Sequence, residues 1–169
     1  MAAGVCLVPE DRWAQGLLRS QSIVANHSLS RYSMLSVTKR RLERRDARRD
    51  LARFKIKSPS IDTPVGQLSG GNAQKVVLAR VIDRHPRVLL LDEPTRGVDI
   101  GAKAEIYAII NQMVAVDVSI VIASSDLLEL IGLCDRIVVL CEGSIAGELQ
   151  RGEATEETIA LLSAGGARS

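Results

Sequence analysis

The stretch from Leu68 to Asp99 decides the fold class, and it reads LSGGNAQKVVLARVIDRHPRVLLLDEPTRGVD. It opens on Ser-Gly-Gly, at the start of a segment that we expect to be helical to about Arg84. A helix start carries exposed N–H groups and a positive dipole end, and bare glycine amides there favour the binding of a phosphate. An apolar run, Val88–Leu91, then leads into Asp-Glu-Pro.

The apolar run predicts a short strand that is buried on both faces, because it is apolar throughout and lies between Pro86 and Pro94. A parallel strand delivers its carboxyl end to the edge where ligands bind, so Asp92 and Glu93 should emerge there together. One carboxylate can hold Mg²⁺, and the next can orient and polarise an attacking water. Either motif alone is more often a plain loop or strand end, but the two in this order favour phosphate chemistry.

These motifs resemble those of ABC-type ATPases. LSGGNAQK is similar to their signature motif, VLLLDEP to their Walker B strand, and residues 95–99 (TRGVD) to their D-loop. The longer wording DEPTRGVDIGAKAEIY resembles the second, C-terminal cassette of the tandem ATPases of bacterial sugar importers of the ribose, galactose and xylose type. VPEDR at 8–12 and SSD at 124–126 fit the same subfamily, and the resemblance covers the chain from about Gly4 to Gly165.

The resemblance implies a role for each matching residue. Glu93 would be the catalytic carboxylate that polarises the water, and Asp92 would bind Mg²⁺. Asp99 would belong to the D-loop that couples two ATP sites. The signature residues would contact ATP held by a partner cassette; they are Ser69, Gly70, Gly71 and Gln74.

Two positions depart from the general ABC pattern. Glu10 stands at the Q-loop position, where most cassettes carry Gln, and an ordinary exposed turn is the alternative there. Ser125 stands where a conventional site carries a His that contacts the γ-phosphate, and a serine cannot do imidazole chemistry. Both departures match the sugar-importer second cassette, which tends to be the weaker catalytic site.

No G-x-x-x-x-G-K-[ST] segment occurs in the 169 residues, so the loop that cradles the α- and β-phosphates is absent from this sequence. We expect an α/β protein with a partial RecA-like (P-loop NTPase type) parallel sheet, its Walker A front missing. Residues 1–12 and 85–169 would form the sheet part, and residues 13–84 the inserted helical subdomain. The sheet should then expose apolar surface, and the isolated chain should be marginally stable or prone to aggregation.

The composition suits this class, with 46% hydrophobic and only 2% aromatic residues. The two histidines, His27 and His85, have no ligand-like partners in the sequence, so a structural metal site is not expected. The remaining elements are expected as a strand at 4–8, a helix at 101–116, a buried strand at 118–123, a helix at 127–133, strands at 135–141 and 144–149, and a helix at 155–162.

Positive charge gathers in one segment, because Lys39 to Lys57 holds ten Lys/Arg and three Asp/Glu. We expect a helix from Ser36 to about Lys55. The run could bind phosphates of nucleic acid or lipid, face a membrane partner, or form a solvated helix with Arg stems on apolar surface. No aromatic residue interleaves it for base stacking, so we favour the solvated helix and expect no nucleic-acid partner.

The sequence therefore predicts part of the ATP-binding subunit of an ABC carbohydrate importer, in which hydrolysis of ATP with Mg²⁺ is coupled to sugar uptake. The expected partners are another ABC cassette, transmembrane permease subunits and, indirectly, a periplasmic or extracellular sugar-binding protein. The expected location is peripheral, on the cytoplasmic side of the bacterial membrane. The alternatives are a non-catalytic truncated-gene product or docking module and, less favoured, an ABC-type DNA-repair ATPase.

Overall fold

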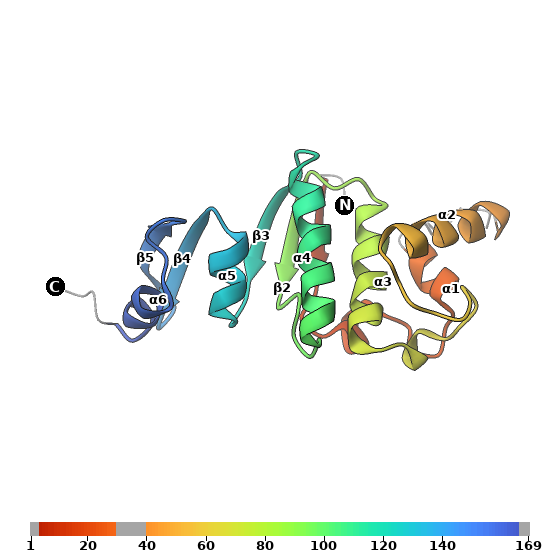
Figure 1. The fold of residues 1–169 in the computed structure, drawn as a ribbon, viewed down its shortest axis with the longest axis horizontal. Helices are drawn as coiled ribbons and strands as arrows, with labels where there is room; N and C mark the ends of the chain where they lie inside the picture. The colour runs from red at the N-terminus through yellow and green to blue at the C-terminus, as the bar shows by residue number, and fades with distance from the viewer. Residues whose placement is uncertain (1–3, 30–39, 166–169) are drawn as a thin grey trace. The chain divides into compact units, whose positions relative to one another are not determined.

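The computed structural model describes residues 4–29 and 40–165 (Figure 1). The chain divides into two compact units, Met1–Ala123 and Ser124–Ser169. The first unit contains a parallel sheet and the helices around the signature motif, and the second contains a hairpin with two helices. None of the described helices combines the length and the apolar character that crossing a membrane requires.

Three parallel strands form the sheet of the first unit, in the order β1–β2–β3. They span Val5–Val8, Val88–Asp92 and Ser119–Ala123. Helix α4, Ile100–Val114, forms the connection from β2 to β3, since parallel neighbours need a long crossover. The expected α/β class with a parallel sheet is confirmed.

The two faces of this sheet differ in burial. Leu89 and Leu91 of β2 are fully buried together with Val8 of β1. On the opposite face Leu7 is 56% exposed and Val121 is 58% exposed. The strands at 88–91 and 118–123 were both expected to be buried. That expectation was wrong for this chain, because the described helices cover only one face of the sheet.

The helical part of the first unit follows β1. A π-helical turn spans Arg12–Gly16, and helix α1 spans Ile23–Ser28. Helix α2 spans Arg40–Arg53, so the first residues of the helix expected from Ser36 lie outside the described residues. A 3₁₀ turn at Val65–Gln67 leads into α3, Gly70–Ile82, which ends two residues before the expected end. Helices α1, α2 and α3 pack against one another, and α3 also packs against β1 and α4.

The second unit is built on an antiparallel hairpin. Helix α5 spans Leu127–Leu133, strands β4 and β5 span Arg136–Cys141 and Ser144–Gln150, and helix α6 spans Glu156–Ser163. Both residues of the turn, Glu142 and Gly143, have positive φ angles of 49° and 76°, as a type I′ hairpin turn requires. The core of the unit consists of Ile137, Val139, Ala154 and Ile159.

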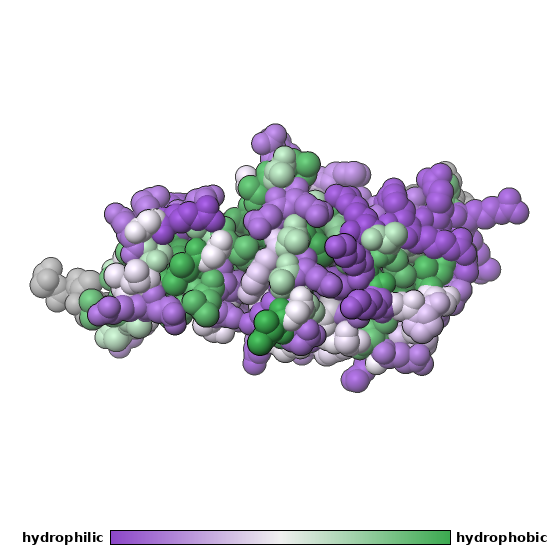
Figure 2. Space-filling model, in the orientation of Figure 1, coloured by the Kyte–Doolittle hydropathy of each residue, from purple (hydrophilic) through white to green (hydrophobic). Residues whose placement is uncertain are grey.

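Hydrophilic residues gather over α2 (Figure 2). Several of its arginines already contact groups of the same chain. Arg44 makes a two-pronged hydrogen bond to Asp62, at 2.6 and 2.7 Å, and Arg53 lies over the ring of Phe54. These internal contacts support a solvated helix whose arginine stems lie on the protein.

Candidate functional site

The carboxyl edge of the parallel sheet brings together the ends of β1 and β2. The register pairs Val8 with Leu91, so Glu10 and Asp92 leave the sheet at the same edge. Glu93 follows with a φ of +46°, a conformation that few residues other than glycine adopt. Its N–H donates to the carbonyl of Ala123 at 2.8 Å, which ties this strained backbone to the end of β3. Strain of this kind is often found at functional sites.

The start of the signature helix is capped by its own serine. Ser69 is the N-cap residue of α3, and its Oγ accepts from the side-chain amide of Asn72 at 2.9 Å and from the Asn72 N–H at 3.4 Å. The cap satisfies one of the amides that a helix start leaves exposed. The hydroxyl of Ser69 therefore already has a structural role in this chain.

Both signature glycines occupy positions with no room for a side chain. A Cβ on Gly70 would lie 2.7 Å from the carbonyl oxygen of Gly97, and a Cβ on Gly71 would lie 2.4 Å from Cβ of Ala102. The first turn of α3 thus packs directly on the D-loop, residues 95–99, and on the first turn of α4. The sequence suggested phosphate binding as the reason for the glycines, and close packing is a second reason that only the structure shows.

The next turn of α3 points into the protein. Gln74 is 1% exposed, and its Oε1 has no hydrogen-bond partner among the described residues. The side chain is buried in this chain, and its role toward ATP of a partner cassette stays a prediction. Lys75 is equally buried, and its Nζ donates to the carbonyl of Lys55 at 2.8 Å and to Oε2 of Glu105 at 2.6 Å.

The Lys75–Glu105 pair fastens the signature helix to α4. The hydrogen bond from Lys75 holds the pKa of Glu105 below its usual range, because it stabilises the ionised carboxylate. No local sequence pattern indicated this pair, since the residues lie on different helices. Asp99, which the sequence placed in the D-loop, caps the same helix by accepting from the N–H of Ala102 at 2.9 Å.

Glu10 and its neighbour Arg12 both contact the D-loop. The carboxylate of Glu10 forms an ion pair with the guanidinium of Arg96. Arg12 donates from Nη1 to the carbonyl of Arg96 at 2.8 Å and from Nη2 to the carbonyl of Gly97 at 3.3 Å. The exit from β1, the D-loop and the start of α3 therefore form one contiguous cluster.

Ser125 belongs to the second unit. The loop before α5 is organised by Asp126, which caps that helix by accepting from the N–H of Glu129 at 3.2 Å. The N–H of Asp126 in turn donates to Oγ of Ser124 at 3.1 Å. Sequence reasoning assigned Ser125 to the site through resemblance alone, and its role stays a prediction.

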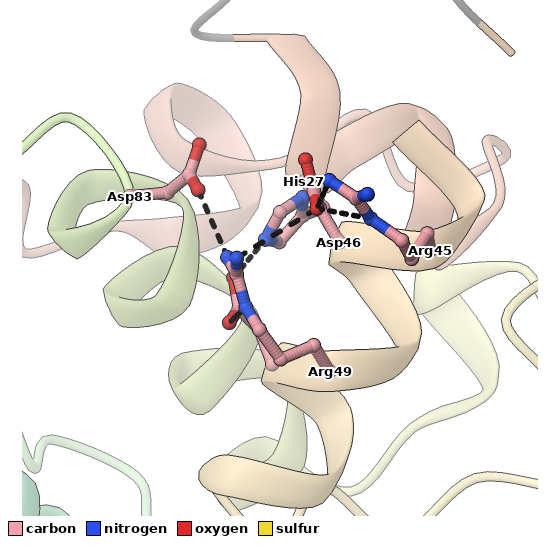
Figure 3. Close-up of polar contacts among 6 residues, drawn as sticks. His27, Arg45, Asp46, Arg49 and Asp83 are labelled. Carbon is pink, nitrogen blue, oxygen red and sulfur yellow. Dashed lines mark hydrogen bonds and ion pairs between the residues drawn. The ribbon is translucent and has the colours of Figure 1, made fainter. Parts of the chain in front are cut away.

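A second polar cluster joins the three helices of the first unit. His27 of α1 is 1% exposed, and its Nε2 lies 2.8 Å from Oδ2 of Asp50 on α2. Arg49 donates from Nε to Oδ1 of Asp50 at 2.8 Å and from Nη2 to Asp83, after α3, at 3.3 Å. Figure 3 shows Arg49 between Asp83 and Asp46.

This cluster has the residue types of a cation site. Ligand atoms of His27, Asp50 and Asp83 lie within 4.8 Å of one another, so the expectation that the histidines lack ligand-like partners was wrong for His27. The guanidinium of Arg49, however, already bridges Asp50 and Asp83. We interpret the cluster as a structural link in which Arg49 supplies the positive charge.

The ion pairs set the charge state of the cluster. Burial by itself would raise the pKa of Asp50, but hydrogen bonds from His27 and Arg49 outweigh it and lower the pKa to about 2. Asp50 is therefore ionised at neutral pH.

Two hollows of about 490 and 620 Å³ border this region, and both are lined by Arg49, Asp83 and His85.

Comparison with known proteins assigns the chain to a family. The family model described as ABC transporter matches residues 5–96, more than half of the chain, so this protein belongs to the ABC transporter family. It is 51% identical over 98% of its length to a xylose import ATP-binding protein of Moorella thermoacetica and 50% identical over 96% to a ribose import ATP-binding protein of Chelativorans sp.. These matches confirm the predicted resemblance to sugar-importer ATPases.

The matches cover only part of each relative. The chain spans 33% of the xylose import protein and 32% of the ribose import protein, about a third of their length. An arabinose import ATP-binding protein of Pseudomonas fluorescens, 43% identical over 96% of the chain, is likewise covered over 32% of its length.

Solved structures confirm the fold. The protein cbiO1 from Clostridium perfringens, part of the ABC transporter complex cbiONQ, superposes with a TM-score of 0.74 at 27% identity, over 95% of this chain and 62% of that chain. The dimeric post-hydrolysis cassette MJ0796, bound to ADP and Pi, gives a TM-score of 0.74 at 20% identity over 87% of this chain and 62% of its own. At that identity the second likeness supports the fold alone.

Proposed function

We propose that this chain is part of the ATP-binding subunit of an ABC carbohydrate importer and takes part in ATP hydrolysis coupled to sugar uptake. The observation that carries the proposal is an identity of 43–51% along nearly the whole chain to proteins named for xylose, ribose and arabinose import. Because these names differ in the sugar, the proposal extends to carbohydrates as a class.

Two carboxylates would serve the ATP site on this chain's own sheet. Asp92 and Glu93 are adjacent at the strand edge and offer the oxygen donors that Mg²⁺ prefers. We assign Asp92 to Mg²⁺ and Glu93 to orienting the water that attacks the γ-phosphate. ATP with Mg²⁺ supplies the phosphoryl group that is transferred to this water. The strained backbone of Glu93 supports this assignment, since it sets the direction of the side chain.

The N-terminus of α3 would serve ATP held by a second cassette. Ser69, Gly70 and Gly71 present the first amides of a helix of 13 residues, and such amides bind phosphate through hydrogen bonds and the helix dipole. Asp99 would hold the D-loop in place as the cap of α4. Glu10 would act at the Q-loop position through Arg96, and Ser125 would occupy the position of the switch histidine.

The assembly implied by this role has several partners. They are a second cassette, transmembrane permease subunits and, indirectly, a periplasmic or extracellular sugar-binding protein. The chain would then work as a peripheral protein on the cytoplasmic side of the membrane. The import proteins among the relatives, and the transporter complex of which cbiO1 is a part, support these partners.

One alternative is a non-catalytic docking module. Such a module would dock on its partners without completing an ATP site. The two readings differ in whether the chain alters hydrolysis by that partner.

The test is calorimetry with MgATP, followed by an ATPase assay with a sugar-importer cassette that carries an intact phosphate-binding loop. We expect no binding by the chain alone and faster hydrolysis when the two are mixed. Ser69→Ala should lower that stimulation by about tenfold or more, the order of effect of removing a donor to a phosphoryl or oxyanion group.

The matched control is Thr155→Ala. Thr155 is also an N-cap residue, of α6 in the second unit. Thr155→Ala therefore removes a comparable helix cap and leaves the signature motif unchanged. An equal loss of stimulation in both variants, or no stimulation by the unchanged chain, would contradict the proposed catalytic role.

A further inference from the structure

We propose that Arg12 is a positioning residue that holds the D-loop against the first turn of the signature helix. The proposal concerns contacts within this chain. Only its consequence for hydrolysis rests on the proposed function.

Arg12 is placed to hold backbone. It begins the turn that follows β1 and is 9% exposed, so its charge is largely withdrawn from water. Its two terminal nitrogens donate to successive carbonyls of the D-loop, those of Arg96 and Gly97. A guanidinium has a rigid planar fork of donors, and a lysine ammonium cannot reproduce this two-point contact.

The D-loop needs an outside donor at these carbonyls. Within the turn, the N–H of Arg96 donates to the carbonyl of Glu93 and the N–H of Val98 donates to the carbonyl of Thr95. The carbonyls of Arg96 and Gly97 take part in neither bond. Gly97 has a φ of +65°, which turns the chain so that both of these carbonyls meet the same side chain.

Arg12 also contacts the signature helix. A Cβ on Gly70 would lie 3.0 Å from Nη2 of Arg12 and 2.7 Å from the carbonyl oxygen of Gly97. The space that the missing side chain of Gly70 leaves is thus filled by the Arg12–Gly97 hydrogen bond. Segments around residues 12, 70 and 97 meet at one point, and Arg12 is the side chain that links them.

The exit from β1 holds the D-loop at a second point. Glu10, two residues before Arg12, pairs with the side chain of Arg96, so Arg96 is held by its carbonyl and by its guanidinium. A shift of this exit therefore carries the D-loop with it. In the proposed function, this contact would transmit a movement at the Q-loop position to the segment that couples the two ATP sites.

The test compares Arg12→Met, Arg12→Lys and Arg19→Met in the full chain by amide hydrogen exchange. Arg19 is the matched control, because it also lies over the Trp13 ring, at 5.1 Å against 5.9 Å for Arg12, and it is exposed. We expect Arg12→Met to speed exchange of the Arg96 and Val98 amides by about tenfold, the effect of losing roughly one net hydrogen bond. Arg19→Met should leave those amides unchanged.

Three outcomes would overturn the proposal. The first is an unchanged rate of D-loop amide exchange in Arg12→Met. The second is an equal increase of the exchange rate throughout β2 and α4 in that variant. The third is D-loop exchange in Arg12→Lys that is as slow as in the unchanged chain. The last variant also serves if Arg12→Met does not fold, since it retains the charge and should still speed D-loop exchange.

An ATPase assay with a loop-bearing partner cassette then adds the functional readout. Arg12→Met should lower kcat at saturating MgATP and leave KM for ATP unchanged, because it disturbs the D-loop and not the partner's own nucleotide pocket. Absence of any stimulation by the unchanged chain would refute the proposed function, while the hydrogen-exchange result would still decide the role of Arg12.

Discussion

The carboxyl edge of the sheet and the polar cluster around His27 both join distant segments, but they do so by different means. At the edge, Gly70 and Gly71 remove side chains so that backbones can approach closely. In the cluster, polar side chains join three helices, since His27 of α1 meets Asp50 of α2 and Arg49 of α2 meets Asp83 at the end of α3. The first region should therefore be the more sensitive to added volume, and the second should be the more sensitive to acid.

The largest expected effect is on the cluster. Asp50→Ala should lower the free energy of unfolding by about 3 kcal/mol, because it leaves the buried His27 ring without its hydrogen-bond partner and removes the buried carboxylate that pairs with Arg49. Urea denaturation followed by the fluorescence of Trp13, the only tryptophan, measures the change. A loss as small as that of an exposed ion pair would show that the cluster does not hold the helices together.

The next effect concerns volume at the edge. Gly71→Ala should destabilise the first unit by about 2 kcal/mol, because its Cβ overlaps Ala102. Adding Ala102→Gly should restore part of the loss, and unfolding of the four members of this double-mutant cycle measures the coupling. The control Gly101→Ala, whose Cβ would approach no atom closer than 3.4 Å, should leave stability nearly unchanged. Equal losses at both positions would contradict the packing argument.

The third effect is the pH dependence that separates the two regions. The pKa of Asp50 lies at about 2 in the folded chain, below the roughly 3.9 of an unfolded aspartate. The stability from this carboxylate is thus present above about pH 4 and lost as the pH falls toward 2. Unfolding free energies between these pH values should fall more steeply in the unchanged chain than in Asp50→Asn. Equal slopes of unfolding free energy against pH in the two proteins would contradict this assignment, since the other carboxyls whose pKa is lowered are present in both.

The smallest effect is expected at the surface of α2. Asp62→Ala removes a two-pronged contact to Arg44, but both groups are exposed and screened by water. Its unfolding midpoint should barely move, in contrast to that of Asp50→Ala. A loss equal to that of Asp50→Ala would show that burial is not what distinguishes the two aspartates.

Local patterns predicted most of the elements. Helix α5 has the expected bounds at 127–133, and the strands at 88 and 119 begin within a residue of expectation. Caps and turns such as Thr155 and Glu142–Gly143 act over a few residues, so they can be read from sequence. The motif residues were found in the same way, because each motif is continuous along the chain.

The contacts that sequence reasoning missed all join residues far apart in the chain. His27 meets Asp50 across 23 positions, Lys75 meets Glu105 across 30, and Arg12 meets Gly97 across 85. Burial was misjudged for a related reason. The apolar sequence of a strand such as 118–123 does not indicate whether one face or both faces are covered. Likewise, the sequence around Gln74 does not indicate that this side chain is buried.

The sequence by itself determined the α/β class, the order of the elements and the chemistry available at the signature and strand-edge motifs, because these depend on short continuous patterns. The tertiary structure decided what each motif touches. It showed that the signature glycines allow the D-loop and α4 to approach the signature helix closely, and that Arg12 joins the D-loop to the signature helix. Such contacts depend on how separate segments pack, and no local pattern encodes their distances.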